Sequence, residues 1–426
     1  MGGEGLERSG PGQFCQHHAD EPVSLCVYKC RLSCYSGDEL KTNERRSRIF
    51  ITTSQILSKI ISIGTAVPAF RHEQDTILRF MQQIYAMNEG GRRKLQFLYR
   101  QSAIASRYSV ISDYSRGASE WEFYPATENL EPFPSLEQRM LWYNRHAAPL
   151  SVQAIEACLK GKARAAEITH LITVSCTGMS APGLDLQVAE LMGLPVNIFR
   201  TSINFMGCYA AIHALKLADA ICLSTPDAKV IIVCTELCTL HFQREASSDN
   251  ITSGLLFGDG AAAALVIAED ARNDRPQPGI RLSSFYSEIL TEGKKDMAWE
   301  LSSTGFRMTL SNYVPDLIEQ DLAPLVDRAL AKNNMHRDRV THWCAHPGGR
   351  KILEAIYKSL HFTNGNLDAS YDVLKEYGNM SSPTLLFVLQ RIMAKLDYER
   401  DNTIFGVAFG PGLTMETFIA TTETAS

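Results

Sequence analysis

Residues 204–215, NFMGCYAAIHAL, turn from a glycine into a helix that is apolar on nearly every side. A helix of this kind must be buried in the interior of a protein. Its first turn carries Cys208, and a thiol there faces unpaired backbone N–H groups and the positive end of the helix dipole, which both favour the thiolate. A lone cysteine in an apolar helix is nevertheless more often an inert core residue than a nucleophile. What Cys208 does therefore depends on the residues that the rest of the chain brings to it.

Strand-like and helical segments alternate on both sides of this helix. Order is expected to begin near Ile49. We expect strands at 170–176, 229–235, 261–267, 341–345, 403–409 and 415–420, and helices at 149–163, 184–192, 208–220, 383–396 and from Arg350 onward. Alternation of this kind predicts an α/β layered fold with a largely internal sheet.

Composition excludes several broad classes. The 426 residues allow roughly two or three domains or one large duplicated unit. A net charge of −5 gives no electrostatic case for nucleic acid or for an anionic membrane as a partner. No stretch approaches the ~18 apolar residues of a membrane span, and residues 1–12 lack the pattern of a secretory signal. Five of the eleven cysteines lie inside apolar runs, namely Cys176, Cys222, Cys234, Cys238 and Cys344. Since the chain is also long for a disulfide framework, we expect reduced thiols and a cytoplasmic protein.

The first 48 residues differ from the rest. Gly, Ser and charged residues dominate without a sustained period, which predicts a disordered extension. The potential metal ligands in it are His17, His18, Cys26, Cys30 and Cys34. The three cysteines are four residues apart, whereas zinc sites prefer two or three intervening residues within a pair and a second pair at a distance. A disordered extension is therefore favoured over a metal site.

A second stretch, residues 343–349 (WCAHPGG), ends a predicted strand at His346 and turns into a helix. A histidine just beyond a strand end can project into a crevice at the sheet edge and hold an imidazolium–thiolate pair with a cysteine. Strand alternation also puts His342, Cys344 and His346 on one side, so a metal site is an alternative. No fourth ligand stands nearby, and such a face usually belongs to the core.

A third stretch, residues 377–383 (YGNMSSP), places Asn379 just before a predicted helix. Ser382 is expected to cap that helix and Pro383 to occupy its first position. An isolated Gly-Asn is usually a turn. The functional alternative is that the Asn379 amide and His346 together donate hydrogen bonds to a thioester oxygen that becomes an enolate. Asparagine suits this role because it donates without adding a charge.

Together and in this order, the three stretches resemble the Cys-His-Asn set of the type III polyketide synthases, the chalcone and stilbene synthase superfamily. The resemblance runs from about residue 49 to 420 and includes residues 256–262 (LFGDGAA) and 405–417 (FGVAFGPGLTMET). It implies a thiolase-like layered α-β-α-β-α fold of two similar halves, although no sequence repeat is visible. The domains would be the extension 1–48, a half 49–276 with the catalytic Cys, and a half 277–426 with the catalytic His and Asn.

The resemblance also implies the reaction. Cys208 would take an acyl group from an acyl-CoA starter, and malonyl-CoA would lose carbon dioxide against His346 and Asn379. The enolate would attack the Cys208 thioester, and repeated cycles would end in closure to a pyrone, resorcinol or phloroglucinol-type ring. CoA thioesters are substrates here, and no cofactor or metal is expected. The family further implies a homodimer with no nucleic-acid or membrane partner.

Pocket residues follow from the same resemblance. They are Phe257, Met308, Thr177, Cys238, His241, Trp299, Phe409 and Gly410. Phe257 matches the family's first gatekeeper phenylalanine, whereas Met308 stands at the second gatekeeper position. Departures from plant chalcone synthases are Cys238 and His241 for threonines, Trp299 near a small glycine, Ala181 for a methionine that reaches into the partner, and Ala408 for a glycine. These departures favour bacterial or fungal members that make alkylpyrones, alkylresorcinols or small phenolic rings.

For the CoA moiety, Lys94 matches a family lysine that pairs with the nucleotide phosphates. Another cationic family position is Phe97 here, so Arg92, Arg93 or Arg100 is expected to substitute for it. A solvated basic face is the alternative for any one of them. Gly348 and Gly349 would let the pantetheine pass close to the backbone.

Three other functions remain open. A ketoacyl-ACP synthase III shares the Cys-His-Asn set but uses an acyl carrier protein and stops after one condensation. A hydroxymethylglutaryl-CoA synthase needs a glutamate base, for which Glu236 is the candidate. A non-catalytic thiolase-fold protein would not need to keep all three catalytic residues.

Overall fold

The structure is a computed structural model that describes residues 56–127, 129–270, 277–290, 293–311, 313–363 and 365–422. The expected disordered extension 1–48, its candidate metal ligands and the expected start of order at Ile49 lie outside these ranges.

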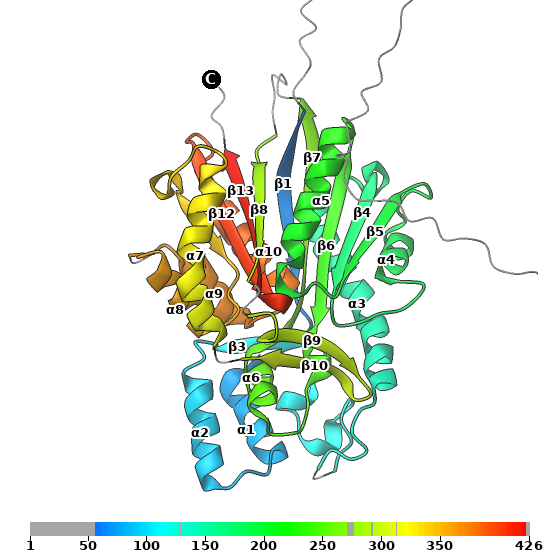
Figure 1. Cartoon of the computed structure of the whole chain (residues 1–426). Coiled ribbons are helices and arrows are strands. Elements are labelled where there is room, and N and C mark those ends of the chain that lie inside the picture. The colour runs from blue at the N-terminus through cyan, green and yellow to red at the C-terminus, as the bar shows by residue number, and fades with distance from the viewer. Residues whose placement is uncertain are drawn as a thin grey trace, which may run out of the picture. The chain divides into compact units, whose positions relative to one another are not determined.

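Nine strands form one mixed sheet in the order β11-β12-β13-β8-β1-β7-β6-β4-β5 (Figure 1). Their bounds are β1 Ile56–Ala66, β4 His170–Ser175, β5 Phe199–Asn204, β6 Lys229–Leu237, β7 Asp259–Asp270, β8 Ile280–Ile289, β11 His342–Ala345, β12 Asn402–Gly410 and β13 Thr414–Thr422. Two short antiparallel pairs lie outside this sheet: β2 Phe70–Glu73 with β3 Ser106–Ser109, and β9 Met297–Ser302 with β10 Gly305–Leu310. The six strands expected from the sequence are all present.

The large sheet consists of two groups of strands that repeat one arrangement. In the order β4-β6-β7-β1, the first pair is parallel and the next two pairs are antiparallel. The order β11-β12-β13-β8 has the same sequence of orientations. The groups meet where Lys59 and Ile60 of β1 pair with Arg281 and Ile280 of β8. The expectation of two similar halves is confirmed by this topology, which no sequence repeat reveals.

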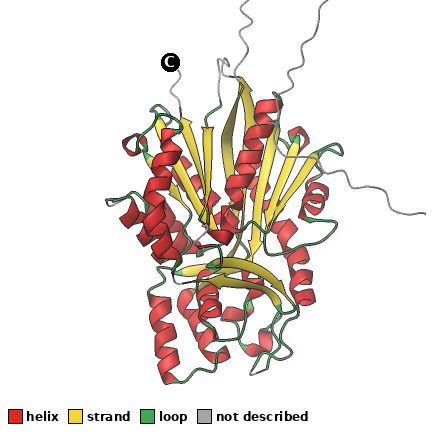
Figure 2. Cartoon of the chain, in the orientation of Figure 1, coloured by secondary structure: helices red, strands yellow, loops and turns green. Residues whose placement is uncertain are grey.

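Helices form layers on and between these groups. The helices are α1 Gln74–Ile84, α2 Glu89–Arg100, α3 Leu136–Leu159, α4 Leu184–Met192, α5 Ala210–Ser224, α6 Ser248–Leu256, α7 Val314–Ala331, α8 Arg350–Ser359, α9 Asp368–Tyr377 and α10 Ser382–Met393. Helices α5 and α10 contact each other and strands of both groups, whereas α3 packs on β1, β6 and β7, and α7 on β8. Figure 2 shows the helices flanking the strands on both sides. The layers follow the expected α-β-α-β-α order.

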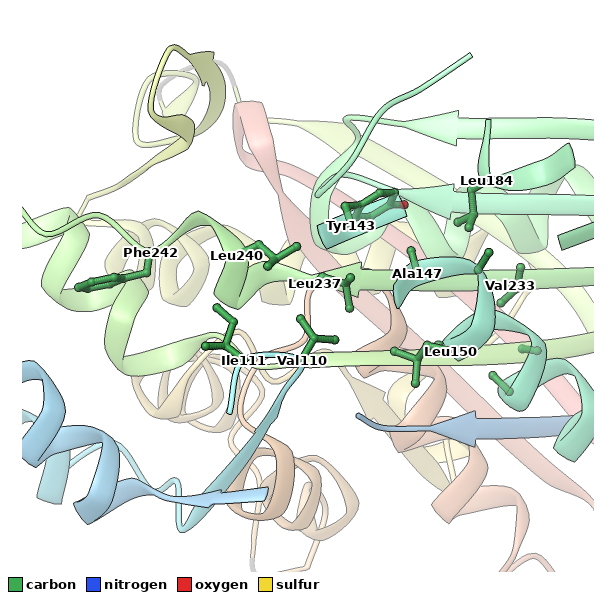
Figure 3. Close-up of a cluster of buried hydrophobic side chains, with 14 of the residues drawn as sticks. Val110, Ile111, Tyr143, Ala147, Leu150, Leu184, Val233, Leu237, Leu240 and Phe242 are labelled. Atoms are coloured by element: carbon green, nitrogen blue, oxygen red, sulfur yellow. The ribbon is translucent and has the colours of Figure 1, made fainter. Parts of the chain in front are cut away.

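Each helical layer has its own hydrophobic cluster. One lies under α3, where Ala147 and Leu150 face Val233 and Leu237 of β6 (Figure 3). A second surrounds α5 and α10, and a third lies under α7 and α8. Burying a single valine or leucine side chain contributes about 1.5–3 kcal/mol, so these clusters hold the layers together. The alanines at 261–264 of β7 are fully buried, and their small side chains let helices approach from both faces.

The starts of α3 and α10 differ from the sequence-based expectation. Helix α3 begins at Leu136 rather than 149, because the Ser135 side chain accepts a hydrogen bond from the Gln138 N–H at 3.2 Å and caps it. Pro149 lies inside this helix. Ser382 is the first residue of α10 rather than its cap, and its hydroxyl donates to a buried carboxylate at 2.9 Å instead of a backbone group. The expected capping by Ser382 is therefore wrong.

Candidate active site

The Cys208 turn is held in place by glycines. Residues 207–209 form a short 3-10 turn, and α5 begins after it at Ala210, two residues later than expected. Gly207 has φ 73°, and a Cβ atom there would lie 2.3 Å from Cδ of Pro411. A Cβ atom on Gly410 would lie 2.5 Å from the Tyr209 ring. The loop after β12 can therefore pack against the cysteine turn only because both positions lack a side chain.

The thiol of Cys208 is buried and lies 3.6 Å from the Ser381 hydroxyl. Burial raises the pKa of Cys208 to about 11, and this effect outweighs the hydrogen bonds from Ser381 and Asn379 that lower it. The expectation that the helix start favours the thiolate is therefore wrong for the free protein. Desolvation of the charged form is the stronger influence.

His346 follows β11 and is almost fully buried. Its backbone N–H donates to the Val407 carbonyl at 2.9 Å, which anchors it beside β12. Both ring nitrogens lack a hydrogen-bond partner among the described residues. Burial lowers the pKa of His346 to about 3, so the ring is neutral at physiological pH. Buried polar groups are normally paired, so these two nitrogens have free hydrogen-bonding capacity for a ligand.

The Asn379 amide is oriented by its neighbours. Its Oδ1 accepts from the Ser381 N–H at 2.8 Å, and its Nδ2 donates to the Gly348 carbonyl at 3.3 Å. Its backbone pairs with the loop before β7, since Asn379 N–H donates to Leu256 O and Gly258 N–H donates to Asn379 O, both at 2.9 Å. These contacts leave the second Nδ2 hydrogen for the Cys208 side, where a hydrogen bond from Asn379 lowers the pKa of the thiol.

Cys208, His346 and Asn379 line one cavity of about 190 Å³, which we call the primary cavity. Its other walls are mainly apolar. They include Leu98, Leu255, Leu256, Phe257, Met297, Met308, Leu310, Val314, Ile352 and Phe409. The structure thus brings together three side chains that lie far apart in the sequence, in an apolar space where hydrogen bonds to an oxyanion are strong.

A second cavity of about 40 Å³ adjoins the first. Phe257 and Met308 line both cavities, as expected of a pair that separates two compartments. Cys238, His241 and Trp299 line the second cavity, and Trp299 of β9 is the strand partner of Met308 of β10. The ring nitrogens of His241 and Trp299 are engaged.

The hydrogen bonds of that wall fix its two large polar rings. His241 Nε2 lies 2.7 Å from the Thr177 carbonyl, and His241 Nδ1 accepts from the Phe306 N–H at 3.1 Å. The Trp299 Nε1–H donates to the Cys176 carbonyl at 2.7 Å. Burial lowers the pKa of His241 to about 3. This histidine is neutral, and its tautomer is set by a backbone acceptor and a backbone donor.

Thr177 is not among the described residues that line either cavity. Its hydroxyl donates to Glu236 at 2.8 Å, and Glu236 also accepts from the Cys176 N–H and the Ser382 hydroxyl, both at 2.9 Å. Burial raises the pKa of Glu236 to about 7. Among the described lining residues of both cavities Glu236 is likewise missing, which disfavours the general base that a hydroxymethylglutaryl-CoA synthase requires.

The floor residues lie where β12 ends. Phe409 lines the primary cavity, and Gly410 packs on the cysteine turn. Ala408 lies inside β12 opposite Glu416, within regular antiparallel pairing. The glycine expected at Ala408 is therefore not needed for the backbone to reach its conformation here.

The expected CoA-binding residues separate into two sets. Gly348 and Gly349 line the primary cavity, and Gly349 has φ 156°, a backbone conformation that favours glycine. Lys94 and Arg100 are exposed on α2 and are not among the described lining residues. Sequence reasoning missed two cations that do line it, Arg350 and Lys351. The sequence did contain an indication of this role, because both cations directly follow the two glycines expected to pass the pantetheine and lie at the start of α8.

Other sequence-based alternatives are also placed. The Cys344 thiol lies 3.7 Å from the Leu385 carbonyl in the core, away from the primary cavity that His346 lines. No group of three or more potential metal ligands occurs within the described part of the chain. The seven cysteines of that part are all buried and unpaired. No described helix is long and apolar enough to cross a membrane.

Comparison with known proteins agrees with this geometry. A family model for the N-terminal domain of chalcone and stilbene synthases matches residues 43–270, and the model for their C-terminal domain matches residues 281–423. The alpha-pyrone synthesis polyketide synthase-like protein Pks18 of Mycobacterium tuberculosis is 32% identical over 333 residues, which cover 78% of this chain and 82% of that protein. Type III polyketide synthase C of Arabidopsis thaliana is 28% identical over 84% of this chain and 94% of its own length.

Two solved structures with a similar fold are also named as polyketide synthases. The crystal structure of PKS-I from the brown alga Ectocarpus siliculosus superposes with a TM-score of 0.82 at 26% identity, covering 87% of this chain and all of that one. The C-terminal type III polyketide synthase domain of Steely1 from Dictyostelium, at 24% identity and a TM-score of 0.78, shares the fold. Since two family models together match most of its length, the chain belongs to the chalcone and stilbene synthase family and is a type III polyketide synthase, an acyltransferase.

Proposed function

We propose that this enzyme condenses malonyl-CoA repeatedly onto an acyl starter held on Cys208, with His346 and Asn379 stabilising the enolate. The observation that carries this proposal is the state of His346. A fully buried histidine with both nitrogens unpartnered is costly unless a ligand completes it. It lines the same cavity as the Cys208 thiol and the Asn379 amide.

In the loading step, Cys208 transfers its proton to His346 and its sulfur attacks the carbonyl carbon of acyl-CoA. The two opposite charges that form stabilise each other at short range in an apolar cavity. The carbon–sulfur bond to CoA breaks, and the departing CoA thiolate takes the proton from His346. The acyl group is then on Cys208 and the imidazole is neutral again.

In the condensation step, malonyl-CoA places its thioester oxygen against His346 and Asn379. Its carboxylate leaves as carbon dioxide, and the electron pair moves onto the thioester as an enolate. His346 and Asn379, both neutral, donate hydrogen bonds to the enolate oxygen and so stabilise its negative charge. The enolate carbon stays unprotonated and remains a nucleophile. This carbon attacks the Cys208 thioester, and the Cys208 sulfur leaves as a thiolate that takes a proton from solvent. The product is a β-ketoacyl-CoA two carbons longer, which reloads Cys208.

We propose that the last step is lactone closure to an α-pyrone. Similarity to a protein named for alpha-pyrone synthesis supports this choice. The small second cavity supports it as well, because about 40 Å³ leaves little room for a long folded intermediate. Resorcinol and phloroglucinol-type rings are the alternative outcomes of a product assay.

The decisive experiment is replacement of Cys208 by alanine. Wild-type protein incubated with an acyl-CoA should gain the acyl mass, and with malonyl-CoA it should release products extended more than once. Cys208→Ala should do neither. Cys222→Ala, which removes a fully buried thiol from α5 away from the cavity, is the matched control and should keep both activities.

Intact-protein mass spectrometry and product analysis give the readouts. A Cys208→Ala protein that still made polyketide would contradict the proposal. Products of a single condensation would indicate a ketoacyl-synthase-like enzyme instead. An active wild type combined with uniform, slow alkylation of all eleven cysteines would show that Cys208 has no special access.

For the CoA phosphates we propose that Lys351 and Arg350 act with the more distant Lys94 and Arg100. Arg350 is already paired with Glu354 at 2.7 Å and with Gln101, so Lys351 is the cation with the fewest commitments. Gly348 and Gly349 would carry the pantetheine past the backbone. Lys351→Ala should raise the KM for malonyl-CoA and leave kcat nearly unchanged.

We also propose a homodimer formed through β5. This strand ends the large sheet, and most of its residues are exposed. Large apolar side chains gather on and near it, among them Phe199, Val196 and Leu191. An exposed apolar strand edge normally needs a partner, and a second copy of the same edge supplies one with two-fold symmetry. A monomer in sedimentation equilibrium would contradict this.

We further propose the cytoplasm as the location of the protein, because reduced thiols fit that compartment.

A further inference from the structure

Two residues that line the second cavity each carry a buried polar atom without a hydrogen-bond partner among the described residues. These atoms are Nη2 of Arg107 and Oγ of Ser253. Neither residue was expected from the sequence to take part in the site. Because unsatisfied buried donors cost about 1–3 kcal/mol each, and more when charged, two in one small cavity indicate a missing ligand.

Two of the three guanidinium nitrogens of Arg107 are hydrogen-bonded, which fixes the side chain and leaves the third nitrogen without a partner in the described part of the chain. Its Nε donates to Oε1 of Gln74 at 3.0 Å, and its Nη1 donates to the Phe257 carbonyl. The Tyr99 hydroxyl donates to the Gly254 carbonyl at 3.3 Å. Burial lowers the pKa of Arg107, and the interaction of the guanidinium with Tyr99 raises that pKa less strongly. No ion pair of Arg107 with a carboxylate occurs within the residues that the structure describes. Arg107 is 4% exposed and its Nη2 atom is buried, so solvent does not complete its hydrogen bonds.

Ser253 lies on α6, four residues before Phe257. Its carbonyl accepts the Phe257 N–H at 3.1 Å, while its hydroxyl is buried and unpaired. Arg107 and Ser253 therefore both hydrogen-bond to the backbone of Phe257, one to its carbonyl and one to its N–H. Both are thus fixed relative to Phe257 and Met308, the two residues that line both cavities and that we call the gate.

We propose that Arg107 and Ser253 form a binding site for a ketone oxygen of the substrate chain beyond the gate of Phe257 and Met308. This inference rests on the proposed function, because condensation of malonyl units places a ketone at every second carbon. A ketone oxygen accepts two hydrogen bonds, one from each donor. A plain hydrocarbon in the same place would leave both donors unsatisfied.

The size of the cavity agrees with this ligand. About 40 Å³ is room for one or two water molecules, which would occupy the site when no chain is bound. A ketone oxygen replaces the hydrogen bonds of such a water, whereas a methylene group does not. The enzyme should therefore select chains that carry an oxygen at this depth.

The experiment compares matched starters that differ by one oxygen. kcat/KM for product formation with malonyl-CoA is measured for hexanoyl-CoA against 5-oxohexanoyl-CoA, and for octanoyl-CoA against 7-oxooctanoyl-CoA. In one of the pairs the wild type should favour the ketone about tenfold, as expected for one to two buried hydrogen bonds. Ser253→Ala should reduce this preference several-fold, and Arg107→Lys should reduce it further.

The plain starters are the internal reference: the readout is the ratio of the two kcat/KM values within each pair, so that a general loss of activity in a variant cancels. Ser248→Ala, at the exposed start of the same helix, should leave both starters and their ratio unchanged. Equal use of both members of each pair by the wild type, or an undiminished preference in Ser253→Ala, would show that the cavity holds water alone. Absence of product from every starter would instead refute the proposed function.

Discussion

The two adjoining cavities each contain a buried histidine, and the two histidines differ in one respect. His346 in the primary cavity and His241 in the second are 1% and 5% exposed, and burial lowers the pKa of both to about 3. His241 uses both ring nitrogens on backbone groups and stacks on Phe306 at a centroid distance of 4.3 Å. His346 uses neither.

This comparison shows that a perturbed pKa alone does not identify a catalytic histidine. Burial shifts both residues in the same direction by the same mechanism. What differs is uncommitted hydrogen-bonding capacity directed into a space that a substrate can enter. On this ground we assign chemistry to His346 and a structural role to His241.

The largest effect should come from His346→Ala. Loss of one enolate donor and of the proton acceptor for Cys208 should reduce the rate of malonyl-CoA decarboxylation and condensation by roughly 10³-fold. Stability should change little or increase, because the replaced ring has no partners to lose. Release of labelled carbon dioxide from malonyl-CoA measures the first quantity, and urea unfolding measures the second.

His241→Ala should show the opposite behaviour. It leaves the Thr177 carbonyl and the Phe306 N–H unpaired and removes a stacked ring, so we expect a loss of about 3 kcal/mol in the free energy of unfolding. Decarboxylation by the folded fraction should stay within a few-fold of wild type. A fall in decarboxylation as large as that of His346→Ala, without loss of stability, would reverse the two assignments.

The smallest effect extends the comparison to Glu236, a buried acid whose oxygens are fully engaged. Its pKa is raised from 4.5 to about 7 by burial. Between these values the unfolded chain releases the proton while the folded chain keeps it, so stability falls as pH rises. This contribution is complete below pH 4.5, and roughly 2 kcal/mol of it should be lost between pH 5 and pH 7.

Glu236→Gln removes the titration and keeps hydrogen-bonding groups of the same shape. Its free energy of unfolding should therefore depend less steeply on pH across this interval than that of the wild type. Urea unfolding at a series of pH values compares the two slopes. Parallel curves would mean that Glu236 is ionised in the folded protein throughout this interval. Its hydrogen-bonding neighbours would then stabilise a buried carboxylate and not a neutral carboxyl group.

Much of the framework could be predicted because it depends on local rules. Period and turn residues located six of the nine strands of the large sheet and five of the ten described helices. Motif order connected Cys208, His346 and Asn379 although they lie in different halves. The expected boundary between the halves near residue 277 remains a prediction. The thiolate expectation for Cys208 failed because the helix-start effect is local, whereas the desolvation that opposes it depends on everything packed around the turn.

Residue types and their order thus determined the family, the layered fold and the three residues proposed for the chemistry. Only the tertiary structure decided which polar groups are satisfied: Thr177, Glu236 and His241 are engaged, while His346, Arg107 and Ser253 keep free capacity. It also decided that Arg350 and Lys351, rather than Lys94 and Arg100, line the primary cavity. The physical reason is that hydrogen-bond satisfaction and cavity walls arise from contacts between distant segments, and no periodicity within one segment encodes them.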